Sequence, residues 1–152
     1  MSTIGTATAA VEVACDPETA FEVFTRDIGA WWRRGTHYWN DAERGVAMRF
    51  EPHVGGRLVE VYDATSGEGL EIGRISAWEP GRRLVFGWRT ADWPAGVSTE
   101  VAVSFEAAGG GTRVVIEHSG WDGLPDGVAL HGQYAQGWAE LLGFFADTPG
   151  VR

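Results

Sequence analysis

The chain has 152 residues, which is long enough for one domain to bury a sizeable core without a disulfide or a structural metal. Its net charge of −9 disfavours nucleic acid and anionic membranes as partners, since both present phosphate groups. The single cysteine, Cys15, excludes an internal disulfide and a multi-cysteine zinc site. No signal peptide or transmembrane span is recognisable, so a cytoplasmic protein is expected.

The first elements expected are a short strand and two helical segments. Small and β-branched residues over 6–13 predict the strand. Asp16 and Pro17 then predict a helix start, because aspartate caps free N–H groups and proline presets φ at the first helical position. Apolar residues recur at helical spacing as far as Ile28, and a short second helix or turn is expected after them.

In the middle of the chain, apolar residues recur at every second position. Alternating segments separated by Gly- or Pro-containing turns predict an antiparallel meander. On the last predicted strand, His118 shares the inward face with Ile116. The strands are expected over residues 46–51, 57–62, 70–78, 84–89, 97–105 and 112–118.

A long helix is predicted from Asp126, as its cap, to about Asp147. One continuous apolar stripe on it consists of His131, Tyr134, Trp138, Leu141, Leu142 and Phe145. The concave face of the sheet is the expected partner of this stripe, which gives an α+β fold of two layers. Where the sheet curves deeply the layers cannot touch everywhere, so a cavity between them is expected.

The whole pattern resembles a known family. The residues that carry the likeness are "FTRDIGAWW" (24–32), "EPHVGGRLVEVY" (51–62), "ISAWEPGRRLVFGW" (75–88), "GGGTRVVIEHSGW" (109–121) and "GW" (137–138). They resemble the START-like (SRPBCC) helix-grip superfamily and, within it, homologues of the activator of the ninety-kilodalton heat-shock protein's ATPase. The resemblance implies one START-like domain over residues 1–152. In that domain a curved antiparallel sheet wraps around a long C-terminal helix, with a short helical pair after the first strand.

An unusual aromatic cluster follows the first helix, with Trp31, Trp32, Tyr38 and Trp39 close together in the sequence. In helix-grip folds this region resembles a lid over the mouth of the cavity. Flat rings offer apolar area with few rotamers to order, and each indole N–H adds one polar contact. The alternative is a small satellite core under a loop. Because Trp31 and Trp32 are adjacent, only one of them is expected to face the cavity.

Three polar residues are further candidates for the site in the cavity. His118 and His131 lie on inward faces of different elements, so they could meet across the cavity and perform acid–base chemistry. No third residue that would orient them is recognisable, so cavity histidines bonded to backbone or water are preferred. Glu60 would be a buried carboxylate and a polar anchor if its face of the strand points inward.

The favoured hypothesis is the binding of an apolar or aromatic small molecule in a cavity between the sheet and the C-terminal helix. No cofactor, metal or catalytic residue is assigned. Two alternatives stay open: a cyclase- or hydrolase-type enzyme acting on the bound ligand, and an interaction module like the chaperone ATPase activators. Formation of a homodimer is left open as well. The expected ligand-binding residues are Trp31, Trp32, Trp39, Glu60, His118, His131, Tyr134 and Trp138.

Overall fold

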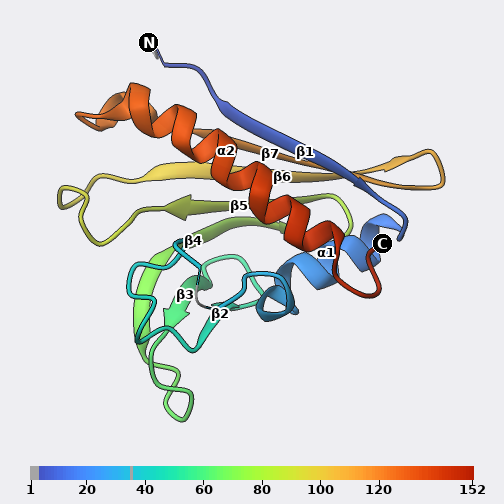
Figure 1. The fold of residues 1–152 in the computed structure, drawn as a ribbon, viewed down its shortest axis with the longest axis horizontal. Coiled ribbons are helices and arrows are strands. Elements are labelled where there is room, and N and C mark those ends of the chain that lie inside the picture. Colours follow the sequence, from blue (N-terminus) through green and yellow to red (C-terminus); the bar gives the residue numbers. More distant parts are fainter. Residues whose placement is uncertain (1–3, 35) are drawn as a thin grey trace.

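The computed structural model describes residues 4–34 and 36–152, and Figure 1 shows how their elements are arranged. The strands are β1 (Ala7–Val13), β2 (Ala47–Phe50), β3 (Arg57–Val61), β4 (Gly69–Glu79), β5 (Arg83–Trp88), β6 (Thr99–Ala108) and β7 (Gly111–Ser119). The α-helices are α1 (Pro17–Thr25) and α2 (Gly127–Ala146). Two short 3-10 helices are η1 (Ile28–Ala30) and η2 (Trp121–Gly123).

The strands form one antiparallel sheet in the order β1-β7-β6-β5-β4-β3-β2. Helix α2 lies diagonally across one face of this sheet, and α1 packs beside the C-terminal end of α2 (Figure 1). The α+β helix-grip fold expected from the sequence is therefore confirmed. Each expected strand is present, with ends that differ from the prediction by a few residues at most.

Strand β4 bends the sheet. Its register shifts once against β3 and once against β5, and each extra residue of a bulge bends the strand that carries it. At the bend Gly73 lies close to Gly87. A Cβ added to Gly73 would lie 1.7 Å from the Gly87 carbonyl oxygen. Only glycine fits there. As a result the β2–β3 end of the sheet turns away from the plane of β1, β7 and β6 (Figure 1).

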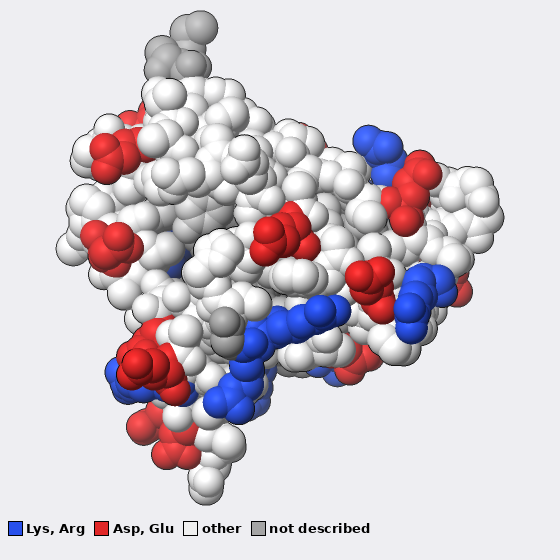
Figure 2. Space-filling model, in the orientation of Figure 1, with Lys and Arg blue, Asp and Glu red and all other residues white. Residues whose placement is uncertain are grey.

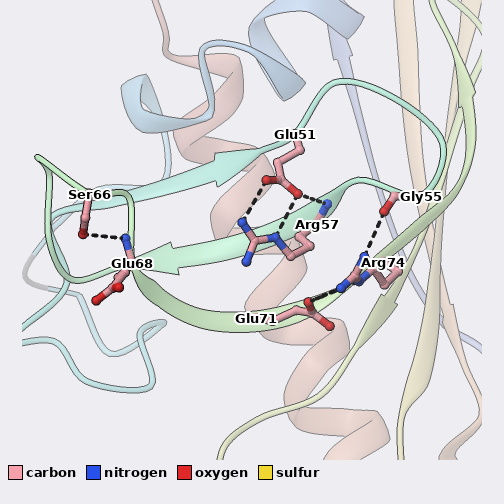
Figure 3. Close-up of polar contacts among 7 residues, drawn as sticks. All are labelled: Glu51, Gly55, Arg57, Ser66, Glu68, Glu71 and Arg74. Atoms are coloured by element: carbon pink, nitrogen blue, oxygen red, sulfur yellow. Dashed lines mark hydrogen bonds and ion pairs between the residues drawn. The ribbon is translucent and has the colours of Figure 1, made fainter.

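Ion pairs hold the turned-away end together on its surface (Figure 3). The Arg57 guanidinium binds both carboxylate oxygens of Glu51 at 2.9 Å, and the Arg57 backbone N–H donates to the same carboxylate at 2.8 Å. These hydrogen bonds to Arg57 lower the pKa of Glu51 to about 2. Beside them, Arg74 binds Glu71 and the carbonyl oxygen of Gly55. The contacts close the turn between β2 and β3.

The two α-helices begin where the sequence predicted. At α1 the Asp16 side chain accepts a hydrogen bond from the Thr19 backbone N–H at 2.7 Å, as expected of a cap. The helix ends at Thr25, however, and Ile28 belongs to the tighter helix η1, which brings Ile28 into the core. Asp126 precedes α2, but its side chain makes no capping hydrogen bond, so that part of the prediction was wrong. The chain enters α2 directly from η2, through a bond from the Gly127 N–H to the carbonyl of Leu124 at 3.2 Å.

Candidate ligand-binding cleft

An open cleft of about 560 Å³ lies between the middle of α2, the end of β5 with its following loop, and the segment that follows η1. Figure 2 shows the face that carries α2, which is hollowed beside the helix and mostly uncharged there. The volume is within the range of roughly 300–1,000 Å³ that small-molecule sites use. Aromatic residues from all these parts line the cleft, among them Trp32, Trp39, Trp88, Trp93, Tyr134 and Trp138.

Trp88 lies at the centre of these rings. Its ring centroid is 5.9 Å from that of Trp32, 5.5 Å from that of Trp138 and 6.0 Å from that of Tyr134. Tyr134 and Trp138 are four residues apart on α2 and therefore share a face of the helix. Most of these ring pairs meet edge to face, and the three tryptophans are buried, so only small parts of their rings reach the cleft.

His118 supports this arrangement from behind the lining. It is fully buried, its Nδ1 accepts the indole N–H of Trp138 at 2.9 Å, and its Nε2 lies 2.6 Å from the hydroxyl of Thr99. The Thr99 hydroxyl in turn donates to the carbonyl oxygen of Trp88 at 3.2 Å. This chain requires the neutral imidazole with its proton on Nε2, and burial lowers the pKa of His118 to about 3. The histidine thus holds the Trp138 ring directly and reaches the Trp88 backbone through Thr99, and with both ring nitrogens bonded it is not poised for proton transfer.

Tyr134 carries a hydroxyl at the junction of two walls. The indole N–H of Trp88 donates to that hydroxyl oxygen at 2.9 Å, and both residues line the cleft. Burial raises the pKa of Tyr134, and the negative charge of Asp92 raises it further. The phenol therefore stays protonated near neutral pH and is able to donate a hydrogen bond.

Glu60 organises two of the loops around the cleft. This fully buried carboxylate accepts hydrogen bonds from the backbone N–H of Asn40 at 2.8 Å, from that of Asp41 at 2.9 Å and from the hydroxyl of Tyr62 at 2.6 Å. The Asn40 side chain donates to Glu60 at 3.2 Å and accepts from the backbone N–H of Ala91 at 2.9 Å. One buried carboxylate thus ties the segment after η1 to the loop after β5.

The ionisable residues on the lining are acidic, apart from His37. Asp92 and Glu140 line the cleft, and no arginine does so in the part of the chain that the structure describes. The nearby guanidinium of Arg89 binds the carbonyl oxygens of its own loop, including that of Trp93 at 3.0 Å. The described lining therefore offers no arginine to a phosphate or a carboxylate.

The expected ligand-binding residues fall into two groups. Trp32, Trp39, Tyr134 and Trp138 line the cleft, whereas Trp31, Glu60, His118 and His131 do not. Whether any of them binds a ligand stays a prediction.

Each residue outside the lining has a partner of its own. Trp31, adjacent to the cleft residue Trp32, is fully buried beside α1, where its N–H donates to the carbonyl of Val23 at 3.2 Å. The imidazole of His131 lies 3.2 Å from the Thr6 carbonyl oxygen, so the two histidines contact different partners and do not meet across the cavity.

Sequence reasoning missed Trp88, Trp93 and the Asn40 link. Trp88 could have been found, because it continues the inward alternation of Leu84 and Phe86 to the end of its strand. Trp93 stands in an irregular loop, where no period indicates which way a side chain points. The Asn40 link joins residues that are 51 positions apart and has no local signal.

No metal site is apparent in residues 4–34 and 36–152, where no three His, Cys, Asp or Glu side chains come close enough to hold an ion. None of the described helices combines the length and the hydropathy that crossing a bilayer requires.

Comparisons with known proteins support the fold over almost the whole chain. A family described as activator of Hsp90 ATPase homolog 1-like protein matches residues 14–148, while no curated protein matches the sequence. Among solved structures the chain is similar to the anthrahydroquino-γ-pyrone synthase Txn09, with 31% identity, 95% of this chain and 96% of that chain covered, and a TM-score of 0.62.

Two further structures share the fold at lower identity. One is the Aha1 dimer from Colwellia psychrerythraea, with 18% identity, 95% of each chain covered and a TM-score of 0.63. The other is protein NE0264 from Nitrosomonas europaea, with 14% identity, 97% and 95% covered and a TM-score of 0.68. At these identities the likeness concerns the fold alone.

Proposed function

The chain belongs to the family of activator of Hsp90 ATPase homolog 1-like proteins, and from this premise we propose that it binds an uncharged, planar aromatic small molecule in the cleft. The observation that carries the proposal is the convergence of aromatic rings from separate segments on one open cleft of about 560 Å³. Rigid rings provide a large contact area at a small cost in side-chain entropy. Flat ligands of a few fused rings match such walls.

The charges around the cleft disfavour an anionic ligand. Asp92 and Glu140 would repel an anionic ligand, and no arginine on the described lining would compensate. A cationic aromatic ligand is the competing class, since tryptophan faces attract cations. The experiment compares an uncharged and an anionic ligand that share a ring system.

The test is a titration of the purified protein with xanthone, an uncharged tricycle, followed by tryptophan fluorescence and equilibrium dialysis. We expect saturable binding of xanthone, and binding of a xanthone carboxylate at least tenfold weaker. Trp138→Leu should weaken xanthone binding, whereas Trp78→Leu, which removes a ring that packs on Phe21 outside the cleft, should not. Absence of saturable xanthone binding, or equal binding of the anion, would contradict the proposal.

A second candidate function is ring closure on the bound ligand. It is supported by Txn09, which is described as a synthase and is 31% identical over 95% of this chain. A suitable probe is an ortho-hydroxyphenyl β-diketone, whose phenol oxygen attacks the distal ketone carbon. A C–O bond forms, one water leaves, and a γ-pyrone ring results. Mass spectrometry would follow the loss of water, and equal rates with and without the protein would exclude this activity for the probe.

A further inference from the structure

We propose that the Tyr134 hydroxyl donates a hydrogen bond to a carbonyl oxygen of the ligand, so that the ligands of the cleft are aromatic ketones, quinones and pyrones. This inference rests on the proposed function and narrows its ligand class. It depends on three features of Tyr134: its oxygen already accepts a hydrogen bond, its hydroxyl keeps its proton, and its ring has a fixed position.

The oxygen of Tyr134 is already used as an acceptor. Trp88 donates its indole N–H to it at 2.9 Å, and an indole N–H can act only as a donor. The O–H of Tyr134 remains to be satisfied, and no acceptor for it lies in the described part of the chain. Water can accept this proton while the cleft is empty. A ligand that displaces the water must offer an acceptor or lose a hydrogen bond.

The hydroxyl keeps its proton near neutral pH. Burial is the main reason that the pKa of Tyr134 is raised, and the charge of Asp92 acts in the same direction. The indole N–H of Trp88 alone would lower this pKa, because it favours the phenolate. The balance leaves a neutral donor on the wall of the cleft. A ligand carbonyl is a matching acceptor, because it accepts this hydrogen bond and brings no donor of its own that would need a partner.

The position of the hydroxyl is fixed by packing. The Tyr134 ring centroid lies 5.1 Å from that of Trp121, 5.0 Å from that of His118 and 6.3 Å from that of Trp93. Trp88 is held from its other side by the Thr99 hydroxyl, which binds its carbonyl oxygen. Trp88 is thus a positioning residue for the Tyr134 hydroxyl.

Other polar groups of the lining suit hydroxyl groups on such a ligand. The carboxylates of Asp92 and Glu140 can only accept hydrogen bonds when ionised, so they match phenolic hydroxyls. The amide of Gln133 can accept or donate. A polycyclic phenol with one carbonyl would therefore use the donor of Tyr134 and the acceptors of the lining together.

The experiment compares xanthone with xanthene, which has the same tricyclic frame and a methylene group in place of the carbonyl. The wild-type protein should bind xanthone about three to ten times more tightly than xanthene, as one added hydrogen bond predicts. Tyr134→Phe should abolish this preference by weakening xanthone binding alone. Tyr38→Phe, which removes the hydroxyl of the other tyrosine on the described lining, should preserve the preference.

A spectroscopic measurement separates a direct hydrogen bond from a loss of shape. The infrared carbonyl stretch of xanthone bound to the wild type should lie at lower frequency than that of xanthone in an apolar solvent. Tyr134→Phe should remove most of that shift, and Trp88→Phe should reduce it. The wild-type spectrum alone can overturn the inference if no shift occurs, even where a variant fails to fold. If neither xanthone nor xanthene binds the wild type, the proposed function itself fails. If both bind equally, only the carbonyl inference fails.

Discussion

Aromatic rings crowd both ends of helix α2, yet only one end is open. The closed end consists of Phe24, Trp31, Phe105 and Phe145, whose neighbouring ring centroids lie 4.8–5.7 Å apart. The open end consists of the cleft rings Trp32, Trp88, Tyr134 and Trp138, with spacings of 5.5–6.0 Å. The spacings barely differ, so crowding of rings does not by itself make a binding site.

The two ends differ in what surrounds the rings. At the closed end α1 and α2 both cover the sheet, and the one indole N–H, that of Trp31, is satisfied by the backbone of α1. At the open end α1 is absent, and the cover is a loop held by the carboxylate of Glu60. The rings there are fixed by polar partners such as His118 instead of by a second helix. At this end, hydrogen bonds to buried partners hold the rings in place.

The largest effect expected from this comparison is at the closed end. Trp31→Ala should lower the free energy of unfolding by about 3–5 kcal/mol, because it empties a large, fully enclosed volume. Trp93→Ala removes the same atoms beside the cleft, where solvent can fill the space, and should cost less than half as much. Urea denaturation of both variants provides the measurement. Equal losses would show that the open end is packed as tightly as the closed end.

The next effect concerns pH and the open end. The pKa of buried His118 is about 3, below the ordinary value of 6.5, so between these values the unfolded chain binds a proton that the folded chain does not. Stability from this residue is complete above pH 6.5 and falls by up to about 1.4 kcal/mol for each pH unit below it. Unfolding free energies measured from pH 7 to 4 should therefore fall more steeply for the wild type than for His118→Gln. Parallel curves would contradict the neutral, bonded histidine.

A smaller effect is expected at the loop that covers the open end. Glu60→Gln replaces an acceptor of several hydrogen bonds with an amide that offers one oxygen. It should lower the free energy of unfolding by about 1–3 kcal/mol. Hydrogen exchange of the Asn40 and Asp41 amides should accelerate, while amides in the C-terminal half of α2 keep their protection. Uniform acceleration would mean that Glu60 supports the whole fold and not the loop alone.

The smallest effect belongs to the surface pair at the turned-away end of the sheet (Figure 3). Glu51→Gln breaks the ion pair with Arg57, and both side chains of this pair are partly exposed. The free energy of unfolding should therefore fall by only about 0.2–1 kcal/mol, and by less in high salt. Thermal denaturation at low and high salt would measure it. Xanthone binding should be unchanged, since neither residue lines the cleft. An altered affinity would show that the β2–β3 end is coupled to the site.

Much of the fold was predictable because it depends on near neighbours in the sequence. The period of two placed His118 on the inward face of its strand, and the helical stripe placed Trp138 and Phe145 on the buried face of α2. The cap at Asp16 was predictable for the same reason, since it bonds to a residue three positions away. Asp126 shows the limit: the residue type fits a cap, but its side chain was not recruited.

The candidate site was predictable only in part. The sequence singled out the cluster from Trp31 to Trp39 as cover for a cavity, and Trp32 and Trp39 line the cleft. It could not separate Trp31 from Trp32, because the 3-10 helix η1 that precedes them sets their directions. It also could not assign partners to Glu60, which would have served equally well as a ligand anchor or as a support for a loop.

The sequence alone determined the order of elements, the inward faces of strands and helix, and an abundance of rings on those faces, since all of these follow from periods along the chain. The tertiary structure decided which rings enclose a space. That outcome depends on the bend of β4 and on contacts such as Trp88 with Tyr134, which are 46 positions apart. A period describes the direction of a side chain from its own backbone. A cleft depends on the distance between backbones, and only the folded chain sets that distance.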